Sequence, residues 1–113
     1  MKAVSVHVVD IANGVVARGM HVQIARVGGD TVFEGVVGSN GVVADKHHED
    51  LFTPGPYELR LHVAAYYRAR GTVLPEPPFV DVLVFRFGIA DTAQHYHLPV
   101  KLTPWGMSLF RGS

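Results

Sequence analysis

Histidines are the residues of this chain whose number and spacing suggest chemistry. The 113-residue chain contains seven histidines and no cysteine. His7 lies on the less apolar face of the alternating stretch 3–10, and His95 and His97 share the less apolar face of the stretch 94–102. An imidazole with a pKa of about 6.5 can accept or donate a proton at neutral pH. Histidines on the less apolar faces of both stretches therefore suit the activation of a water molecule.

The His95-x-His97 spacing also suits two ligands of one metal ion. Such a site needs further ligands from His7 or a carboxylate, and no metal-binding signature supports it. We therefore expect no metal. For any single histidine the alternative is a structural or solvent-exposed role, and we expect that role for His62, on the charged face of the stretch 57–63.

The C-terminal tail alternates almost to its last residue. Met107, Leu109 and Arg111 fall on one side of an extended chain, and Ser108 and Phe110 on the other. This pattern predicts a strand held in place, whereas an expression scar has no reason to continue a strand. The terminal serine is not in a Gly-x-Ser-x-Gly elbow, so acyl-enzyme chemistry is not indicated.

Short stretches rich in Val, Ile, Phe and Tyr, separated by Gly, Pro, Asn and Asp, predict an all-β protein. We expect a short helix over 64–71, ending at Gly71. Seven or eight short strands with one helix predict a β-sandwich in a single domain spanning 1–113. The expected strands are 3–10, 20–27, 31–38, 42–45, 57–63, 77–89, 94–102 and 106–112.

The stretch 77–89 is apolar on both faces of an extended chain. In a sandwich of this size one face of each sheet is normally solvated. We therefore expect this strand to face a second subunit.

Overall composition bears on the choice of partners. Ten basic and ten acidic residues cancel, and no basic stripe is present, so neither nucleic acid nor an anionic membrane is an expected partner. No apolar run approaches the roughly 18 residues of a membrane span, and the first residues do not form a signal peptide. We expect a cytoplasmic protein.

The last 19 residues, HYHLPVKLTPWGMSLFRGS, resemble the C-terminus of the 5-hydroxyisourate hydrolases, the transthyretin-related enzymes of urate breakdown. The segments SVHVVDIANGVVARGMHVQI and FTPGPYELRLHVAAYYRARG are similar to the opening and to a central segment of that family. The resemblance covers close to the full length. The Arg-Gly-Ser ending favours the enzyme branch over transthyretin, which lacks it.

The resemblance implies a transthyretin-like β-sandwich of two four-stranded sheets with one short helix. It also implies a homotetramer, a dimer of dimers, with active sites in the channel where the dimers meet. The implied reaction adds water to a ring amide of a small purine-derived substrate and opens the six-membered ring. It requires neither a metal nor an organic cofactor.

Roles for individual residues follow from the same resemblance. His7 and His97 are the implied catalytic histidines, which activate and orient the water. The implied pocket lining is the terminal tetrapeptide, in which Arg111 and the backbone or carboxylate of Ser113 hold the polar ring; its members are Phe110, Arg111, Gly112 and Ser113.

The sequence departs from the family at three positions. Val42 stands where the family has a catalytic arginine in an Asp-Gly-Arg turn, and Leu109 and Phe110 stand where it has Thr and Tyr. Loss of one preorganised donor typically costs ~2.7–4 kcal/mol, or ~100–1000-fold in rate. Lys46 lies roughly 13 Å further along the same strand and is a poor substitute.

Two hypotheses follow from this less polar pocket. The first is a hydrolase whose substrate is an N-methylated relative of 5-hydroxyisourate, such as the trimethyl compound of methylxanthine breakdown. The second is a catalytically weakened, transthyretin-like protein that binds small molecules. Retention of His7, His97 and the Arg-Gly-Ser end favours the enzyme.

Overall fold

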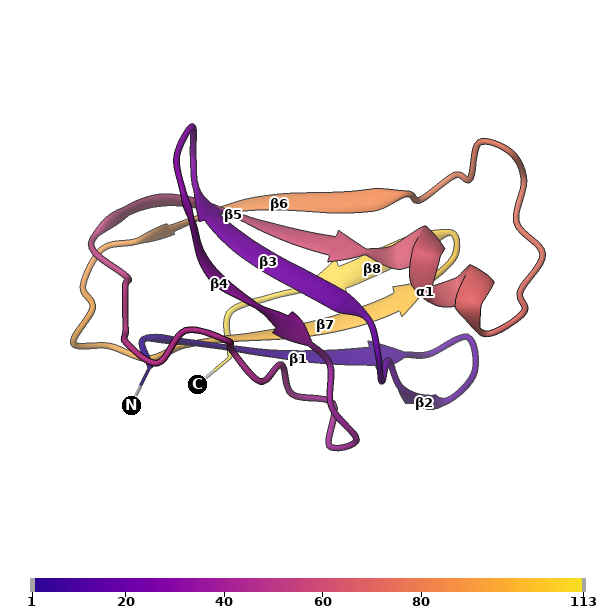
Figure 1. Cartoon of the computed structure of the whole chain (residues 1–113), viewed down its shortest axis with the longest axis horizontal. Coiled ribbons are helices and arrows are strands. Elements are labelled where there is room, and N and C mark those ends of the chain that lie inside the picture. Colours follow the sequence, from indigo (N-terminus) through magenta and orange to yellow (C-terminus); the bar gives the residue numbers. More distant parts are fainter. Residues whose placement is uncertain (1, 113) are drawn as a thin grey trace.

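Two four-stranded β-sheets pack face to face in the computed structural model, which describes residues 2–112 (Figure 1). The first sheet has the strand order β2-β1-β7-β8 and the second the order β4-β3-β5-β6. The predicted sandwich is therefore confirmed. The strands are β1 (Val4–Asp10), β2 (Val15–Val16), β3 (His21–Arg26), β4 (Thr31–Val36), β5 (Gly55–His62), β6 (Val82–Ile89), β7 (Tyr96–Thr103) and β8 (Gly106–Leu109).

Alternation along β1 and β7 separates the core from the outer face of the first sheet. Val6 and Val8 of β1 and Val100 of β7 are fully buried between the sheets. His7 and His97, which lie at intervening positions, are half-buried on the other side. Because successive side chains of a strand point to opposite faces, burial of the valines places these histidines on the outer face.

Strands β1 and β7 pair in parallel, whereas every other strand pair in the two sheets is antiparallel. In this register Ser5 lies beside His97 and His7 beside Pro99. The two strands are about 90 residues apart in the chain, so this pairing brings residues from both ends together.

The short helix α1 (Val63–Ala69) follows β5 directly and lies at the end of the sandwich opposite the two chain ends (Figure 1). The first turn is tied to the chain before β6, because the carbonyl of Asp81 accepts hydrogen bonds from the amides of Val63 and Ala64. Gly71 ends the helix with a φ of 89°, a conformation that glycine adopts without strain. The helix predicted over 64–71 is confirmed, with its start one residue earlier and its end two residues earlier.

A buried carboxylate joins the helix to the first sheet. Asp10, at the end of β1, is fully buried and accepts hydrogen bonds from the hydroxyls of Tyr66 and Tyr67 at 2.8 and 2.7 Å. Burial alone would raise the pKa of Asp10, but hydrogen bonds from Asn13 and the two tyrosines outweigh it and lower the pKa. The helix is thereby held against the strand that carries His7.

Several expected strands are shorter than predicted: β8 ends at Leu109 rather than at 112, and the stretches 77–89 and 42–45 differ most. The stretch 77–89 becomes a strand only at Val82, because Pro77 and Pro78 have no amide hydrogen to donate and the following residues meet the helix. Phe79 lies outside the sheet with 75% of its surface exposed. The stretch 42–45 is reduced to isolated bridges made by Val42 and Val43.

The helix α1 has seven residues, and no helix within residues 2–112 is long and apolar enough to cross a membrane.

Candidate active site

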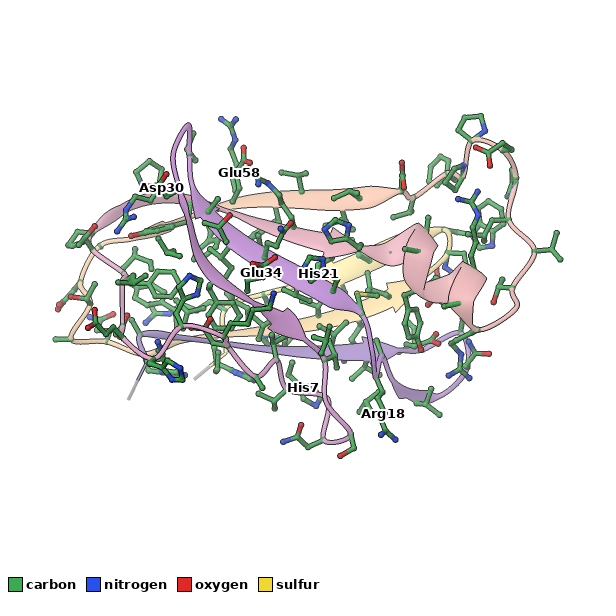
Figure 2. The ribbon with its side chains drawn as sticks, in the orientation of Figure 1. His7, Arg18, His21, Asp30, Glu34 and Glu58 are labelled. Carbon is green, nitrogen blue, oxygen red and sulfur yellow. The ribbon has the colours of Figure 1, made fainter. Side chains whose placement is uncertain are left out.

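Three histidines and one serine gather on the outer face of the β2-β1-β7-β8 sheet. Ser5 and His7 come from β1, His97 from β7 and His95 from the residue before β7. Figure 2 shows His7 on the side of β1 that faces away from the second sheet. Alternation and the parallel register place all four side chains on one surface, as the sequence predicted for the histidines.

Hydrogen bonds connect three of these residues in a chain. The hydroxyl oxygen of Ser5 lies 2.7 Å from Nδ1 of His97 and 2.9 Å from Nε2 of His95. Nδ1 of His95 in turn lies 2.9 Å from the backbone carbonyl oxygen of Lys2. The Nε2 atom of His97 makes no hydrogen bond within residues 2–112, so this nitrogen is available to a water molecule or a substrate.

Burial lowers the pKa of His97 below the usual value, and the neighbouring imidazoles of His7 and His95 lower it further. Both effects disfavour the protonated ring, because burial removes solvation and the neighbours carry like charge when protonated. His97 is therefore held neutral at neutral pH, which is the state that a general base requires.

A glycine presses against the ring of His7. Gly41 has a φ of 84°, and a Cβ atom built on it would lie 2.5 Å from Nε2 of His7. The Gly41 carbonyl also accepts a hydrogen bond from the amide of Val8, at 2.9 Å. A side chain at position 41 would both strain the backbone and displace the histidine ring.

Val42 lies directly across from His7. The two residues form an antiparallel bridge, flanked by the hydrogen bonds Val8 to Gly41 and Val43 to Val6. In such a pair the side chains point to the same face and their Cβ atoms are typically about 4.5–5.5 Å apart. Position 42, where the resemblance implies an arginine, therefore presents an isopropyl group beside the first histidine.

Lys46 does not take the place of the arginine that the resemblance implies at position 42. Its ammonium group lies 3.7 Å from Glu34 Oε1, on the outer face of the other sheet.

The C-terminal tail continues along β7 after β8 ends. Val100 pairs with Leu109 and His97 with Gly112, so the register runs on without a shift. The amide of Gly112 donates to the carbonyl of His97 at 2.7 Å. A Cβ atom at Gly112 would lie 2.9 Å from Cδ2 of His97, so this glycine lies directly against the ring.

Alternation sends two of the predicted pocket residues to the opposite face. Leu109 packs against the hydrophobic core. The guanidinium of Arg111 lies over the ring of Tyr96, 4.0 Å from its centroid, and donates to the Gln94 side chain and the His95 carbonyl. Neither side chain joins the histidines. Position 112 faces the histidines, and Leu109 and Arg111 lie three and one residues from it. Because side chains of an extended chain alternate between faces, both point to the opposite side.

Two further residues were predicted to line the pocket, Phe110 and Ser113. Phe110 lies opposite Pro99 in the continued register, on the histidine face, with 52% of its surface exposed. Ser113 lies outside the described residues.

Ser5 was not predicted to belong to the site, and His95 was considered only as a metal ligand. The parity of both residues was visible in the sequence. The hydrogen bonds of Ser5 to His97 and to His95 were not visible, because they depend on the parallel pairing of β1 with β7. Within residues 2–112 no group of three or more His, Asp or Glu side chains is arranged to hold a metal ion.

Comparison with known proteins places this geometry in context. The model of the HIUase/Transthyretin family matches residues 4–112. A 5-hydroxyisourate hydrolase of Deinococcus radiodurans is 43% identical over 111 residues, which cover 95% of this chain and 92% of the relative. The solved structure of Klebsiella pneumoniae 5-hydroxyisourate hydrolase has a TM-score of 0.83 and 28% identity, with each chain covered completely. Sea bream transthyretin, solved in complex with thyroxine, has a TM-score of 0.83 at 21% identity, covering 97% of this chain and 94% of that one, which shows the shared fold.

Proposed function

Because this chain belongs to the HIUase/transthyretin family, we propose that it is a 5-hydroxyisourate hydrolase, a cyclic amide hydrolase of urate breakdown. The observation that carries the proposal is the pair formed by His7 and His97 on one open sheet face, with Nε2 of His97 unengaged within residues 2–112. The curated hydrolase from Deinococcus radiodurans matches nearly the whole chain, which supports the same activity.

His97 is the proposed general base. Its Nε2 atom accepts a proton from water as the water oxygen bonds to the carbonyl carbon of the ring amide. The ring carbon–nitrogen bond then breaks and the leaving nitrogen takes up a proton, so that a carboxylate and an opened ring result. Proton transfer by a positioned histidine typically contributes ~100–10,000-fold in rate.

His7 is the proposed second histidine, which orients the water or relays the proton. It is fixed from one side by the backbone of Gly41, so its position does not depend on a charged partner. Fixed reacting groups lower the barrier because the entropy of orientation is lost before the reaction begins.

The tail has two proposed roles. Gly112 packs on His97 and shapes the floor of the pocket, and Phe110 covers part of the same face. Arg111 acts from the core side, where its stacking on Tyr96 anchors the tail. Contact between Ser113 and the polar ring stays a prediction.

The substrate channel is proposed to form between subunits of a homotetramer. The strands β6 and β8 are each one edge of their sheet, and a cavity of about 130 Å³ lies between them. This cavity lies on the core side of the first sheet, opposite to the histidines, so it supports subunit pairing at these edges and is not the channel itself. Phe85 and Phe87 of β6 line the cavity and are only half-buried, which supports pairing with a second copy. A sedimentation measurement that gives a stable monomer would contradict this assembly.

An N-methylated substrate is a second candidate, favoured by the position of Val42 opposite His7. An isopropyl group beside the catalytic histidine offers apolar contact to an N-methyl group and no donor to a carbonyl. Phe110 adds apolar surface on the same face, whereas Leu109 is directed to the core and does not contribute. A catalytically weakened binding protein is the alternative, because the same valine removes a donor.

One experiment separates these functions. A urate-type oxidase generates 5-hydroxyisourate or its trimethyl analogue in the cuvette, and the ultraviolet decay of each is followed with and without this protein. Acceleration of 5-hydroxyisourate decay is the expected result. Faster decay of the trimethyl compound would instead identify the methylated substrate. Saturable binding of either compound without acceleration would contradict the hydrolase and support the binding protein.

Val42→Arg tests the specificity argument. We expect the ratio of kcat/KM for 5-hydroxyisourate to that for its trimethyl analogue to rise by roughly 100-fold, the scale of one preorganised donor. Val42→Leu is the matched control, because it changes volume without adding a donor. An unchanged ratio in Val42→Arg would contradict a role for position 42 in substrate choice.

A further inference from the structure

Donor and acceptor can be assigned for every hydrogen bond in the chain that links Lys2 to His97. It runs from the Lys2 carbonyl to His95, from His95 to Ser5, and from Ser5 to His97, with donor–acceptor distances of 2.9, 2.9 and 2.7 Å. A backbone carbonyl only accepts hydrogen bonds, so Nδ1 of His95 carries a hydrogen. The other three assignments follow from this one.

A neutral imidazole has one N–H group, so Nε2 of His95 is an acceptor. The hydroxyl of Ser5, 2.9 Å away, therefore donates its single hydrogen to this atom. The oxygen of Ser5 then has only lone pairs to offer His97. Nδ1 of His97, at 2.7 Å, must be the donor.

The consequence lies at the far nitrogen of the ring. A neutral His97 that carries its hydrogen on Nδ1 has an unprotonated Nε2, and only an unprotonated nitrogen can accept a proton from water. In the opposite tautomer Nε2 would carry the hydrogen and could not accept a proton. The only lone pair of the ring would then be on Nδ1, which faces Ser5 and is out of reach of the substrate.

We propose that Ser5 and His95 are positioning residues, which hold neutral His97 in the tautomer whose Nε2 is free to act as the base. The proposal rests on the proposed hydrolase function for its catalytic consequence. Its structural part, the tautomer, is independent of any activity.

Alternative roles for the two residues are less consistent with their contacts. Ser5 and His95 are half-buried on the outer face, outside the hydrophobic core. Each places its polar atoms toward the next member of the chain, and no carboxylate takes part in these bonds. Packing alone would not require a hydroxyl at position 5, between two imidazoles.

The test is nitrogen NMR of ¹⁵N-histidine-labelled protein, in which protonated and unprotonated ring nitrogens have well-separated shifts. The His97 signals are assigned by their loss in His97→Gln. At a pH where His97 is neutral, the wild type is expected to show Nδ1 protonated and Nε2 unprotonated. A protonated Nε2 in the wild type would overturn the proposal, whether or not the protein is a hydrolase.

Ser5→Ala removes the acceptor of the His97 Nδ1 hydrogen. We expect His97 to shift toward the Nε2-protonated tautomer and kcat to fall by roughly 10- to 100-fold with little change in KM, the scale for partners that orient a functional histidine. Ser5→Thr keeps the hydroxyl and should restore both the tautomer and the rate. Equal losses in Ser5→Ala and Ser5→Thr would reduce the role of position 5 to packing and overturn the proposal.

His95→Gln supplies an independent variant, because it removes the ring that orients the Ser5 hydroxyl. Its matched control is His48→Gln, which replaces an exposed histidine in the loop before β5. A tautomer shift and a lower kcat in His95→Gln alone would support the proposal, and an unchanged tautomer in a folded His95→Gln would overturn it. A wild type that shows the expected tautomer but no hydrolysis would contradict the proposed function and leave the tautomer assignment standing.

Discussion

Each of the two sheets carries a pair of histidines on adjacent strands of its outer face. On the first sheet these are His7 and His97, and on the second they are His21 and His62. The rings of His21 and His62 are stacked with their centroids 4.8 Å apart. Sequence parity alone makes the two pairs look alike, yet their surroundings differ.

In the second pair, the Nε2 atom of each ring is bonded to a side chain of the same sheet face. Nε2 of His21 lies 2.9 Å from a carboxylate oxygen of Glu34, and Nε2 of His62 donates to the side-chain oxygen Oε1 of Gln23 at 3.1 Å. Hydrogen bonds from Gln23 and His21 lower the pKa of Glu34, so the carboxylate stays charged beside the pair. These contacts make a surface network that stabilises the strands.

The first pair is held by a hydroxyl and by backbone. His97 is bonded to Ser5 and packed by Gly112, and His7 is packed by Gly41. No salt bridge within residues 2–112 includes His7 or His97. The comparison teaches that the two pairs differ in their partners: a carboxylate binds the pair on the second sheet, whereas a hydroxyl binds His97 and no carboxylate takes part.

The largest effect predicted from this contrast is that of replacing His97. His97→Gln removes the proposed base, and kcat/KM for ring opening should fall by roughly 1000-fold or more. His62→Gln on the other sheet is the matched control and should retain nearly full activity. Comparable losses in the two variants, measured on folded protein by ultraviolet decay, would erase the distinction between the two faces.

The next effect concerns the glycine that packs on His97. Gly112→Ala introduces a Cβ atom 2.9 Å from Cδ2 of His97, so the ring or the tail must move. A displaced base should lower kcat by about 10- to 100-fold, because small errors in position are costly in catalysis. Gly106→Ala, where no atom lies within 4 Å of the added Cβ, is the control and should have little effect on kcat.

A smaller effect is expected in the pH dependence of activity. Burial and then the charge of His7 lower the pKa of His97, so its neutral, active form persists to lower pH. The acidic limb of kcat/KM should therefore lie below the usual histidine pKa of about 6.5. His7→Gln should move that limb upward, whatever it does to the maximal rate, and a limb that stays in place would show that His7 does not act electrostatically on His97.

The smallest effect is one of stability on the other sheet. Burial, and next the charge of His21, lower the pKa of His62, so below a pH of about 6.5 the unfolded chain binds more protons than the folded one. The free energy of unfolding should fall as the pH drops through this range toward the folded pKa. His62→Gln should flatten the fall, measured by denaturant unfolding at several pH values, and His48→Gln should keep the wild-type slope.

Several features could be predicted from local pattern. Alternation in β1, β5 and β7 identified the buried and outward faces correctly, because one side of each strand must leave water. The end of α1 at Gly71 was also predictable, since only glycine adopts the required φ easily. The stretch 77–89 was predicted too long, because its prolines and the contact of Asp81 with the helix act against a regular hydrogen-bonding pattern.

The candidate site was predictable only in part. His7 and His97 were identified from parity and resemblance, and the structure places them on one face with Gly112. The sides taken by Leu109 and Arg111 required the register of the tail on β7. That register depends on hydrogen bonds between segments, and a one-residue shift would exchange every side chain between core and solvent.

By itself, the sequence determined that this is a β-sandwich with histidines on strand faces, because strand alternation and turn residues act over a few neighbouring residues. Only the tertiary structure decided which partner each histidine binds and through which nitrogen. The parallel pairing of β1 with β7 brings Ser5 and His95 to one edge of His97, and the continued pairing of the tail brings Gly112 to another. Contacts between residues about 90 positions apart depend on packing of the whole chain, and no local pattern encodes the direction of a hydrogen bond.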